Sequence, residues 1–162
     1  MINFADVQRG IIGLLRADSN LVAYLSGTGN GSNNIREMQY QENLGVDSFP
    51  AVRVDLSPQA PIGNGRDRII LSTIVFRIDT FSEQKSSREC NHLLTLAERA
   101  LFDKQIRNGL DSNNVHTYDL LRIDCTGSDP AYRTFERYWQ GTLYFRSDAN
   151  YRYHPESALV YP

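Results

Sequence analysis

The sequence predicts an α+β domain, in which an antiparallel or mixed sheet of four to five strands carries two main helices on one face. Apolar residues recur at helical spacing near the N-terminus and again after residue 86. Between and after these stretches, apolar and polar residues alternate as they do in strands that bury one face. Strands that follow one another without an intervening helix favour antiparallel pairing, with the helices gathered on one side.

The composition is that of a single globular domain. The chain has 162 residues, of which 41% are hydrophobic and 22% charged. Lys and Arg total 17 against 19 Asp and Glu, so no overall positive field attracts nucleic acid or anionic lipid. The sequence has neither the pattern of a signal peptide nor an apolar run of membrane-spanning length, so we expect a cytosolic product without membrane contact. The two cysteines, Cys90 and Cys125, are expected as buried thiols.

The N-terminal segment is predicted to form two helices. Asn3 is placed as the N-cap of the first, with Asp6 three residues later. Residues 18–20, Asp-Ser-Asn, interrupt the pattern and cap a short second helix, "LVAYL". The stretch Gly27 to Asn34, "GTGNGSNN", is predicted to be a loop, because a phosphate-binding loop needs a strand before its glycines. The apolar stripe of the first helix comprises Phe4, Val7, Ile11, Leu14 and Leu15.

Three strand-like runs follow. The alternation is weak from Ile35 to Tyr40, firmer from Phe49 to Leu56, and longest from Arg68 to Phe81. The second and third runs flank "SPQAPIGNG", whose prolines and glycines disfavour regular pairing. We therefore expect a long protruding hairpin loop from Ser57 to Arg68.

A second main helix is predicted from about Ser87. Ser86 and Glu89 have the spacing of a capping box, and Asn108-Gly109 is expected to stop the helix. Its buried stripe is predicted to comprise Cys90, Leu93, Leu94, Ala97 and Leu101.

Two further strands, Tyr118 to Thr126 and Phe135 to Arg146, are predicted to complete the sheet, with "GSDPAYR" joining them. Residues 1–147 then form one domain. Residues 148–162 are aromatic, contain proline and lack a periodic pattern, so we expect an extended C-terminal arm.

Sorting each predicted strand by parity separates two faces of the sheet. One face is apolar and should pack under the helices, because a dozen large side chains at about 1.5–3 kcal/mol each can sustain a domain. This predicted core comprises Val52, Val54, Leu56, Ile70, Ile74, Phe76, Ile78, Leu121, Ile123, Cys125, Trp139, Leu143 and Phe145.

The opposite face is polar and of mixed sign. Three strands carry the same tripeptide pattern, Arg-(Val/Ile)-Asp, at residues 53–55, 77–79 and 122–124. Each copy places an Arg and an Asp on one face, where they can pair across strands. Mixed charge with tyrosines suits a protein contact better than a phosphate backbone. The candidate interface residues are Arg53, Asp55, Arg66, Arg68, Arg77, Asp79, Arg122, Asp124, Tyr138, Tyr144, Tyr151 and Tyr153.

An alternative of another class is a metal-dependent nuclease in which Asp55, Asp79 and Asp124 bind Mg²⁺. Each of these carboxylates follows an Arg that can neutralise it without metal, which favours ion pairs over a metal site. A small regulatory binding domain would need an apolar pocket, for which the sequence carries no signal. We therefore predict no catalytic residue, no cofactor and no metal.

Four segments together resemble the tail-terminator, or tail-completion, proteins of tailed bacteriophages and prophages. The resemblance is one of layout over Phe4 to Arg146, and it leaves the Gly27–Asn34 loop and the arm unmatched. The segments are "VQRGIIGLLRADSNLVAYL", "FPAVRVDL", "IILSTIVFRIDTFSEQKSSRECNHLLTLAERAL" and "RYWQGTLYFR".

The resemblance implies a non-enzymatic virion protein that assembles in the host cytoplasm. It implies a homo-oligomeric ring, commonly hexameric, that caps the tail tube protein and joins the tail to head-side neck or connector proteins. DNA would pass through the lumen without sequence-specific binding. A head-to-tail adaptor or stopper protein of the same neck region remains an alternative.

Overall fold

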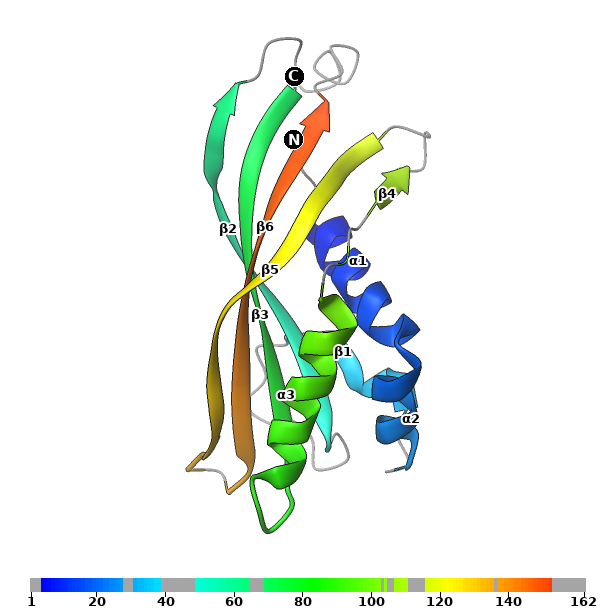
Figure 1. Cartoon of the computed structure of the whole chain (residues 1–162), viewed down its shortest axis with the longest axis vertical. Helices are drawn as coiled ribbons and strands as arrows, with labels where there is room; N and C mark the ends of the chain where they lie inside the picture. Colours follow the sequence, from blue (N-terminus) through cyan, green and yellow to red (C-terminus); the bar gives the residue numbers. More distant parts are fainter. Residues whose placement is uncertain are drawn as a thin grey trace.

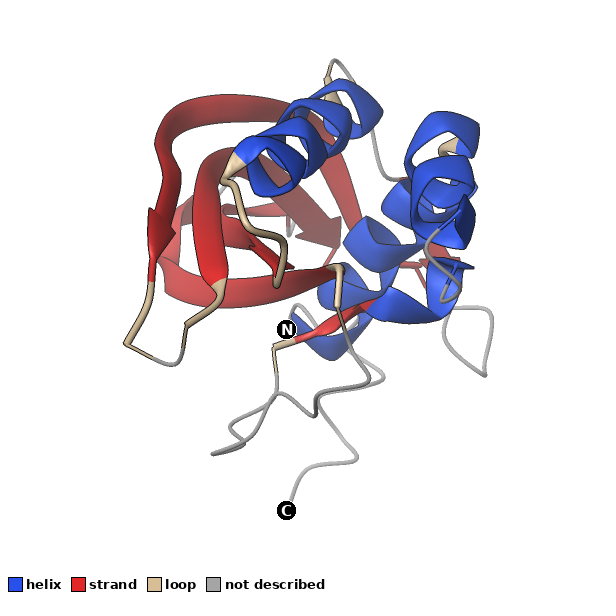
Figure 2. Ribbon diagram, turned by 90° about the horizontal axis from the view of Figure 1, so that it is seen from below, coloured by secondary structure: helices blue, strands red, loops and turns tan. Residues whose placement is uncertain are grey.

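The computed structural model describes residues 4–27, 31–38, 49–64, 69–102, 104, 107–110, 116–135 and 137–152. The fold is α+β, as predicted: the helices lie together on one side of a mixed sheet (Figure 1), and the sheet is strongly curved (Figure 2). The elements are α1 (Phe4–Ala17), α2 (Ser19–Gly27), η1 (Gly31–Asn34), β1 (Ile35–Glu37), β2 (Ala51–Asn64), β3 (Ile69–Ser82), α3 (Arg88–Leu101), β4 (Arg107–Leu110), β5 (His116–Arg133) and β6 (Trp139–Arg152).

Within the described residues the sheet has six strands in the order β1-β2-β3-β6-β5-β4. The pairing of β1 with β2 is parallel and the other pairings are antiparallel. The sequence predicted four to five strands. The strand it missed is β4, which contains the Asn108-Gly109 pair that was expected to stop a helix.

The two N-terminal helices form as predicted. Val7, Ile11 and Leu15 of α1 are fully buried, because they share the stripe that faces the sheet. The N–H of Leu21 donates to Asp18 Oδ1 over 2.8 Å, which confirms the predicted cap of α2. Gln8 Nε2 donates to the carbonyl of Val54 over 2.8 Å, so α1 is tied to β2.

Helix α3 buries the predicted stripe but begins and ends differently. Ser87 is the N-cap and its side chain makes no capping hydrogen bond, so the predicted capping box is wrong. The carboxylate of Glu89 instead accepts hydrogen bonds from Ser82 Oγ and Gln84 Nε2, which compete for the oxygens that a box would use. The helix ends at Leu101, the last residue of the apolar stripe, rather than near residue 108.

The long loop predicted from Ser57 to Arg68 is not a loop over most of its length. Strand β2 continues to Asn64 and pairs with β3 to the end, with register shifts around Pro61. Within the described part of the chain, β1 pairs only with residues 52–54 of β2. This part of β2 is therefore an edge of the described sheet, where a proline can lack its N–H donor without breaking a ladder on the open side. Residues 65–68 lie outside the described residues.

Strands β5 and β6 are also longer than predicted. The "GSDPAYR" segment belongs to β5, whose pairing with β6 passes through three register shifts and reaches Arg133. Bulges of this kind accommodate glycine and proline within a strand. Strand β6 begins at Trp139 and runs to Arg152, so residues 148–152 of the expected arm pair with β3. Residues 153–162 lie outside the described residues, and an arm there stays a prediction.

The core lies between the sheet and the helices and includes most of the predicted apolar face. Phe76 and Phe145 are directly opposite one another on β3 and β6, with ring centroids 5.0 Å apart and planes at 10°. Cys125 is exposed, so its predicted burial is wrong; a register shift follows it in β5 and displaces the strand from the regular pleat. Trp139 is half-buried, and its Nε1 donates to the carbonyl of Gln84 over 3.0 Å.

Candidate interaction surface

The first two Arg-x-Asp tripeptides lie side by side on β2 and β3. Their antiparallel register sets Arg53 opposite Asp79 and Asp55 opposite Arg77. The Nε atom of Arg77 lies 3.3 Å from Asp55 Oδ2 and 3.1 Å from Asp79 Oδ2. One guanidinium therefore bridges two carboxylates and offsets part of their negative charge.

Asp79 is the most deeply buried member of this cluster, at 0% exposure. Its Oδ1 accepts a hydrogen bond from Thr142 Oγ1 over 2.5 Å and one from Gln140 Nε2 over 3.3 Å. Its Oδ2 is close to Arg77, yet the geometry is not that of a directed hydrogen bond, so the contact is an ion pair only. Asp79 thus holds β3 to β6 and does not present its carboxylate to a partner.

Arg53 is turned inward as well. Its Nη1 donates to the carbonyl of Asn34 over 2.7 Å and to that of Val52 over 3.0 Å. Burial, and to a smaller extent the nearby positive charge of Arg36, lowers the pKa of Arg53. The Arg53 side chain therefore connects η1 to β2. Asn34 adds a second connection, because its Nδ2 donates to the carbonyl of Pro50, next to β2, over 2.8 Å. Arg53 therefore acts inside the domain rather than on its surface.

The third tripeptide pairs with a fourth that the sequence interpretation missed. Residues 122–124 run antiparallel to residues 146–148, Arg-Ser-Asp, so that Arg122 faces Asp148 and Asp124 faces Arg146. This copy has Ser147 at its centre, whereas the other three copies have Val or Ile there. The detectable signal was spacing: the same interval separates Arg53 from Arg77 and Arg122 from Arg146.

This register separates Asp124 from the other two carboxylates of the nuclease alternative. Arg146, which faces Asp124, pairs with Val75 on β3, and Val75 lies about 13 Å along the strand from Asp79. Among the described residues, no group of three or more His, Cys, Asp or Glu side chains is placed to hold a metal ion. The three carboxylates do not converge.

The two described tyrosines of the predicted interface differ in environment. Tyr138 is half-buried, with its ring 5.4 Å from that of Phe49 and 5.6 Å from that of Phe81. Tyr144 is exposed and donates its hydroxyl proton to Asp129 Oδ2 over 2.8 Å, a hydrogen bond that raises the pKa of Tyr144.

The remaining predicted interface residues are described only in part. Arg122 and Tyr151 lie in β5 and β6, where the backbone pairing is described but the side chains are not. Arg66, Arg68 and Tyr153 lie outside the described residues.

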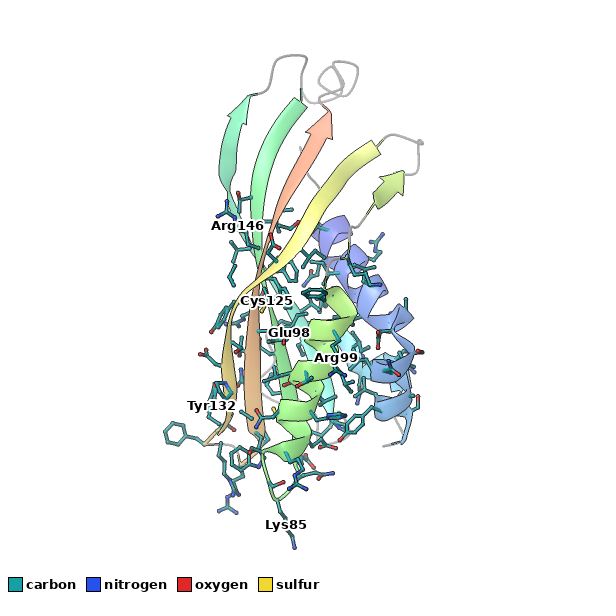
Figure 3. The ribbon with its side chains drawn as sticks, in the orientation of Figure 1. Lys85, Glu98, Arg99, Cys125, Tyr132 and Arg146 are labelled. Carbon is teal, nitrogen blue, oxygen red and sulfur yellow. The ribbon has the colours of Figure 1, made fainter. Side chains whose placement is uncertain are left out.

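Among the described residues, the most exposed large apolar side chain lies where the sequence placed only the start of a strand. Phe135, at the turn between β5 and β6, has a relative exposure of 107%, and Tyr132 beside it has 51%. Arg133 and Arg137 flank the turn and are exposed. We call residues 132–135 and 137 the β5–β6 tip; the label on Tyr132 marks its position at the lower end of β5 (Figure 3). The sequence signal was an aromatic residue between arginines, "YRTFER".

An open pocket of about 260 Å³ lies at the same end of the molecule. Its lining combines one aromatic ring and a proline with polar and acidic side chains: Phe49, Pro50, Glu83, Gln84 and Glu89. We call it the Glu83 pocket. No described helix is both long and apolar enough to cross a bilayer.

The comparisons with known proteins concern the fold. A scan against protein-family models and a search of curated proteins both give no match. Among solved structures, the chain is similar to a chain of the "Virion of native gene transfer agent (GTA) particle", with a TM-score of 0.60 and 15% sequence identity. The alignment covers 89% of this chain and 94% of that chain. The two chains therefore share one fold over nearly their whole lengths.

Proposed function

We propose that this protein is a structural virion protein that forms a ring on the head-proximal end of a tail tube, ends tube growth there and joins the tail to head-side neck proteins. The observation that carries the proposal is the fold shared with a virion chain over 94% of that chain's length. The sequence layout supports the more specific terminator role.

The charge arrangement supports a structural role rather than catalysis. Arg77 is bound between two carboxylates, and Asp79 is held by Thr142 and Gln140, so these groups are engaged in joining strands. Each copy carries a formal net charge of −2, so a ring of copies has no overall positive charge with which to hold DNA as it passes through the lumen.

The test is deletion of the coding sequence from the genome that produces the particle, followed by electron microscopy of the lysate. We expect full heads and separate tail tubes whose lengths spread widely, because no ring stops polymerisation. Supply of the intact protein in trans should restore joined particles with tails of one length. Joined particles with uniform tails in the deletion strain would refute the proposal. Uniform but unattached tails would assign the protein to the adaptor or stopper role instead.

A further inference from the structure

The β5–β6 tip is a hydrogen-bonded turn that exposes an apolar side chain to water. The N–H and Oγ1 of Thr134 both donate to the carbonyl of Tyr138, over 2.9 and 3.1 Å. The N–H of Arg137 donates to the carbonyl of Thr134 over 3.1 Å, with Arg137 in the left-handed region at φ 70°. These bonds hold the backbone on both sides of Phe135, so little backbone entropy is lost when its exposed side chain meets a partner.

The Glu83 pocket has the complementary character. Phe49 and Pro50 give it an apolar wall, and Glu83 and Glu89 give it negative charge, with Glu83 exposed. Its volume of about 260 Å³ is sufficient for a phenyl ring, since an apolar cavity of about 150 Å³ holds benzene. Lys85, the nearest lysine in the sequence, projects downward away from the body of the molecule (Figure 3).

The pocket is not filled by the tip of its own chain. Phe135 has full exposure, and the residues that follow the tip contact the region of the pocket: Tyr138 packs on Phe49, and Trp139 donates to the carbonyl of Gln84. One chain thus carries both an apolar projection flanked by arginines and an apolar depression flanked by glutamates, at separate positions.

We propose that Phe135 of one copy inserts into the Glu83 pocket of the next copy, with Arg133 and Arg137 beside the glutamates of that pocket. This contact specifies the interface between neighbouring copies in the proposed ring, and it rests on the proposed function. Because two different surfaces meet, the contact is of the head-to-tail kind that a ring of identical copies requires. The charges orient the approach and disfavour the reversed contact between two tips or two pockets.

The test is disulfide trapping between two chains that each carry one introduced cysteine, in a Cys125→Ser background that removes the exposed thiol and leaves the buried Cys90. One chain carries Tyr132→Cys beside the tip and the other Lys85→Cys beside the pocket, so Phe135, Arg133 and Glu83 all remain. The matched control replaces Lys85→Cys with Glu98→Cys, an exposed position on α3 (Figure 3). Under an added oxidant, we expect the Tyr132–Lys85 pair to form the linked dimer at least about tenfold faster than the control pair, because the contact raises the local thiol concentration. Equal rates for the two pairs would overturn the proposal.

Charge reversal gives an independent test of the same contact. Arg133→Glu should slow the cross-link to about the rate of the control pair, and Glu83→Arg in the pocket chain should restore the faster cross-link with an Arg133→Glu tip. Phe135→Asp, at a fully exposed position, should leave the thermal unfolding midpoint unchanged and abolish rings on tail tubes. If Phe135→Asp still restores uniform, joined tails to the deletion strain, the contact is wrong and the ring stands. If even the intact protein leaves tail length unaffected, the proposed function itself is wrong.

Discussion

Asp79 is the side chain that links the charged residues of the sheet to its interior. It is buried on the face opposite the helices and accepts from Thr142 and Gln140 on β6, while Arg77 neutralises it from the same strand. A buried carboxylate with these partners is stable only while they remain, because the burial of an unpaired polar group is unfavourable. Asp79 therefore stabilises the fold, because its hydrogen bonds connect β3 to β6.

We predict that Asp79→Ala lowers the free energy of unfolding by about 2 kcal/mol, because Thr142 loses its acceptor in a buried position. Urea denaturation followed by circular dichroism measures the change. The matched control is Asp124→Ala, at an exposed carboxylate of the same pattern, where a change within about 0.5 kcal/mol is expected. Equal effects of the two substitutions would show that burial does not distinguish the copies.

The sequence identified these charged residues but not how deeply their side chains are buried. It placed Arg53 and Asp79 on the strand face opposite Val54 and Ile78, and the register sets Arg53 opposite Asp79. It could not reveal that both side chains are buried, since the curvature of the sheet and the partners Asn34 and Thr142 come from segments far apart in the chain. Phe135 was missed for the opposite reason: alternation assigned it to a strand, whereas hydrogen bonds place it in a turn.

At the scale of elements, the contact between α3 and β6 depends on a residue without a side chain. Gly141 lies beneath the helix, where an added Cβ would be 2.6 Å from Leu94 Cδ1 and 3.2 Å from Leu94 Cγ. Leu94 is itself buried in the core, so it has little room to turn aside. The glycine therefore sets how closely α3 approaches the sheet.

We predict that Gly141→Ala destabilises the protein by about 1–2 kcal/mol, because Leu94 must leave its rotamer or α3 must shift. The thermal unfolding midpoint is the measurement. Gly127→Ala on β5 is the control, since its added Cβ would meet only Tyr144 Cδ2 at 3.9 Å, and little change is expected there. A neutral Gly141→Ala variant would indicate that the helix packs more loosely than described.

Helices were easier to predict than strand ends. The apolar stripes of α1 and α3 repeat over several turns, so several residues independently indicate each helix. Proline and glycine at residues 58–64 and 127–130 suggested loops, but both stretches are strand edges with bulges. Whether a proline lies on an edge depends on which strand lies beside it, and that is a property of the assembled sheet.

For the whole molecule, the two long hairpins are related by an approximate two-fold axis. The pairing of β2 with β3 ends at Asn64 opposite Ile70, and that of β5 with β6 ends at the corresponding Arg133 opposite Trp139. The stacked Phe76 and Phe145 lie at the centre, and the tips point to opposite ends of the long axis (Figure 1).

Among the residues that the structure describes, each hairpin leaves part of its outer strand without a neighbouring strand, and such an edge can pair with another sheet. Both edges carry a proline at equivalent positions, Pro61 and Pro130, together with bulges. The edge of β5 is further occupied at Ala131, whose N–H donates to Asn91 Oδ1 on α3 over 2.9 Å. Features of this kind oppose association through sheet edges and favour contacts between copies through side chains, such as those of the β5–β6 tip.

The central claim, a ring on the end of a tail tube, is tested most directly by imaging. Purified protein would be added to tail tubes from the deletion strain, and cryo-electron microscopy would classify the tube ends. We predict a closed ring of this protein at one end of each tube and none along its sides, with further tube growth stopped at that end. Tubes whose two ends stay bare, or that continue to lengthen in the presence of excess protein, would contradict the account.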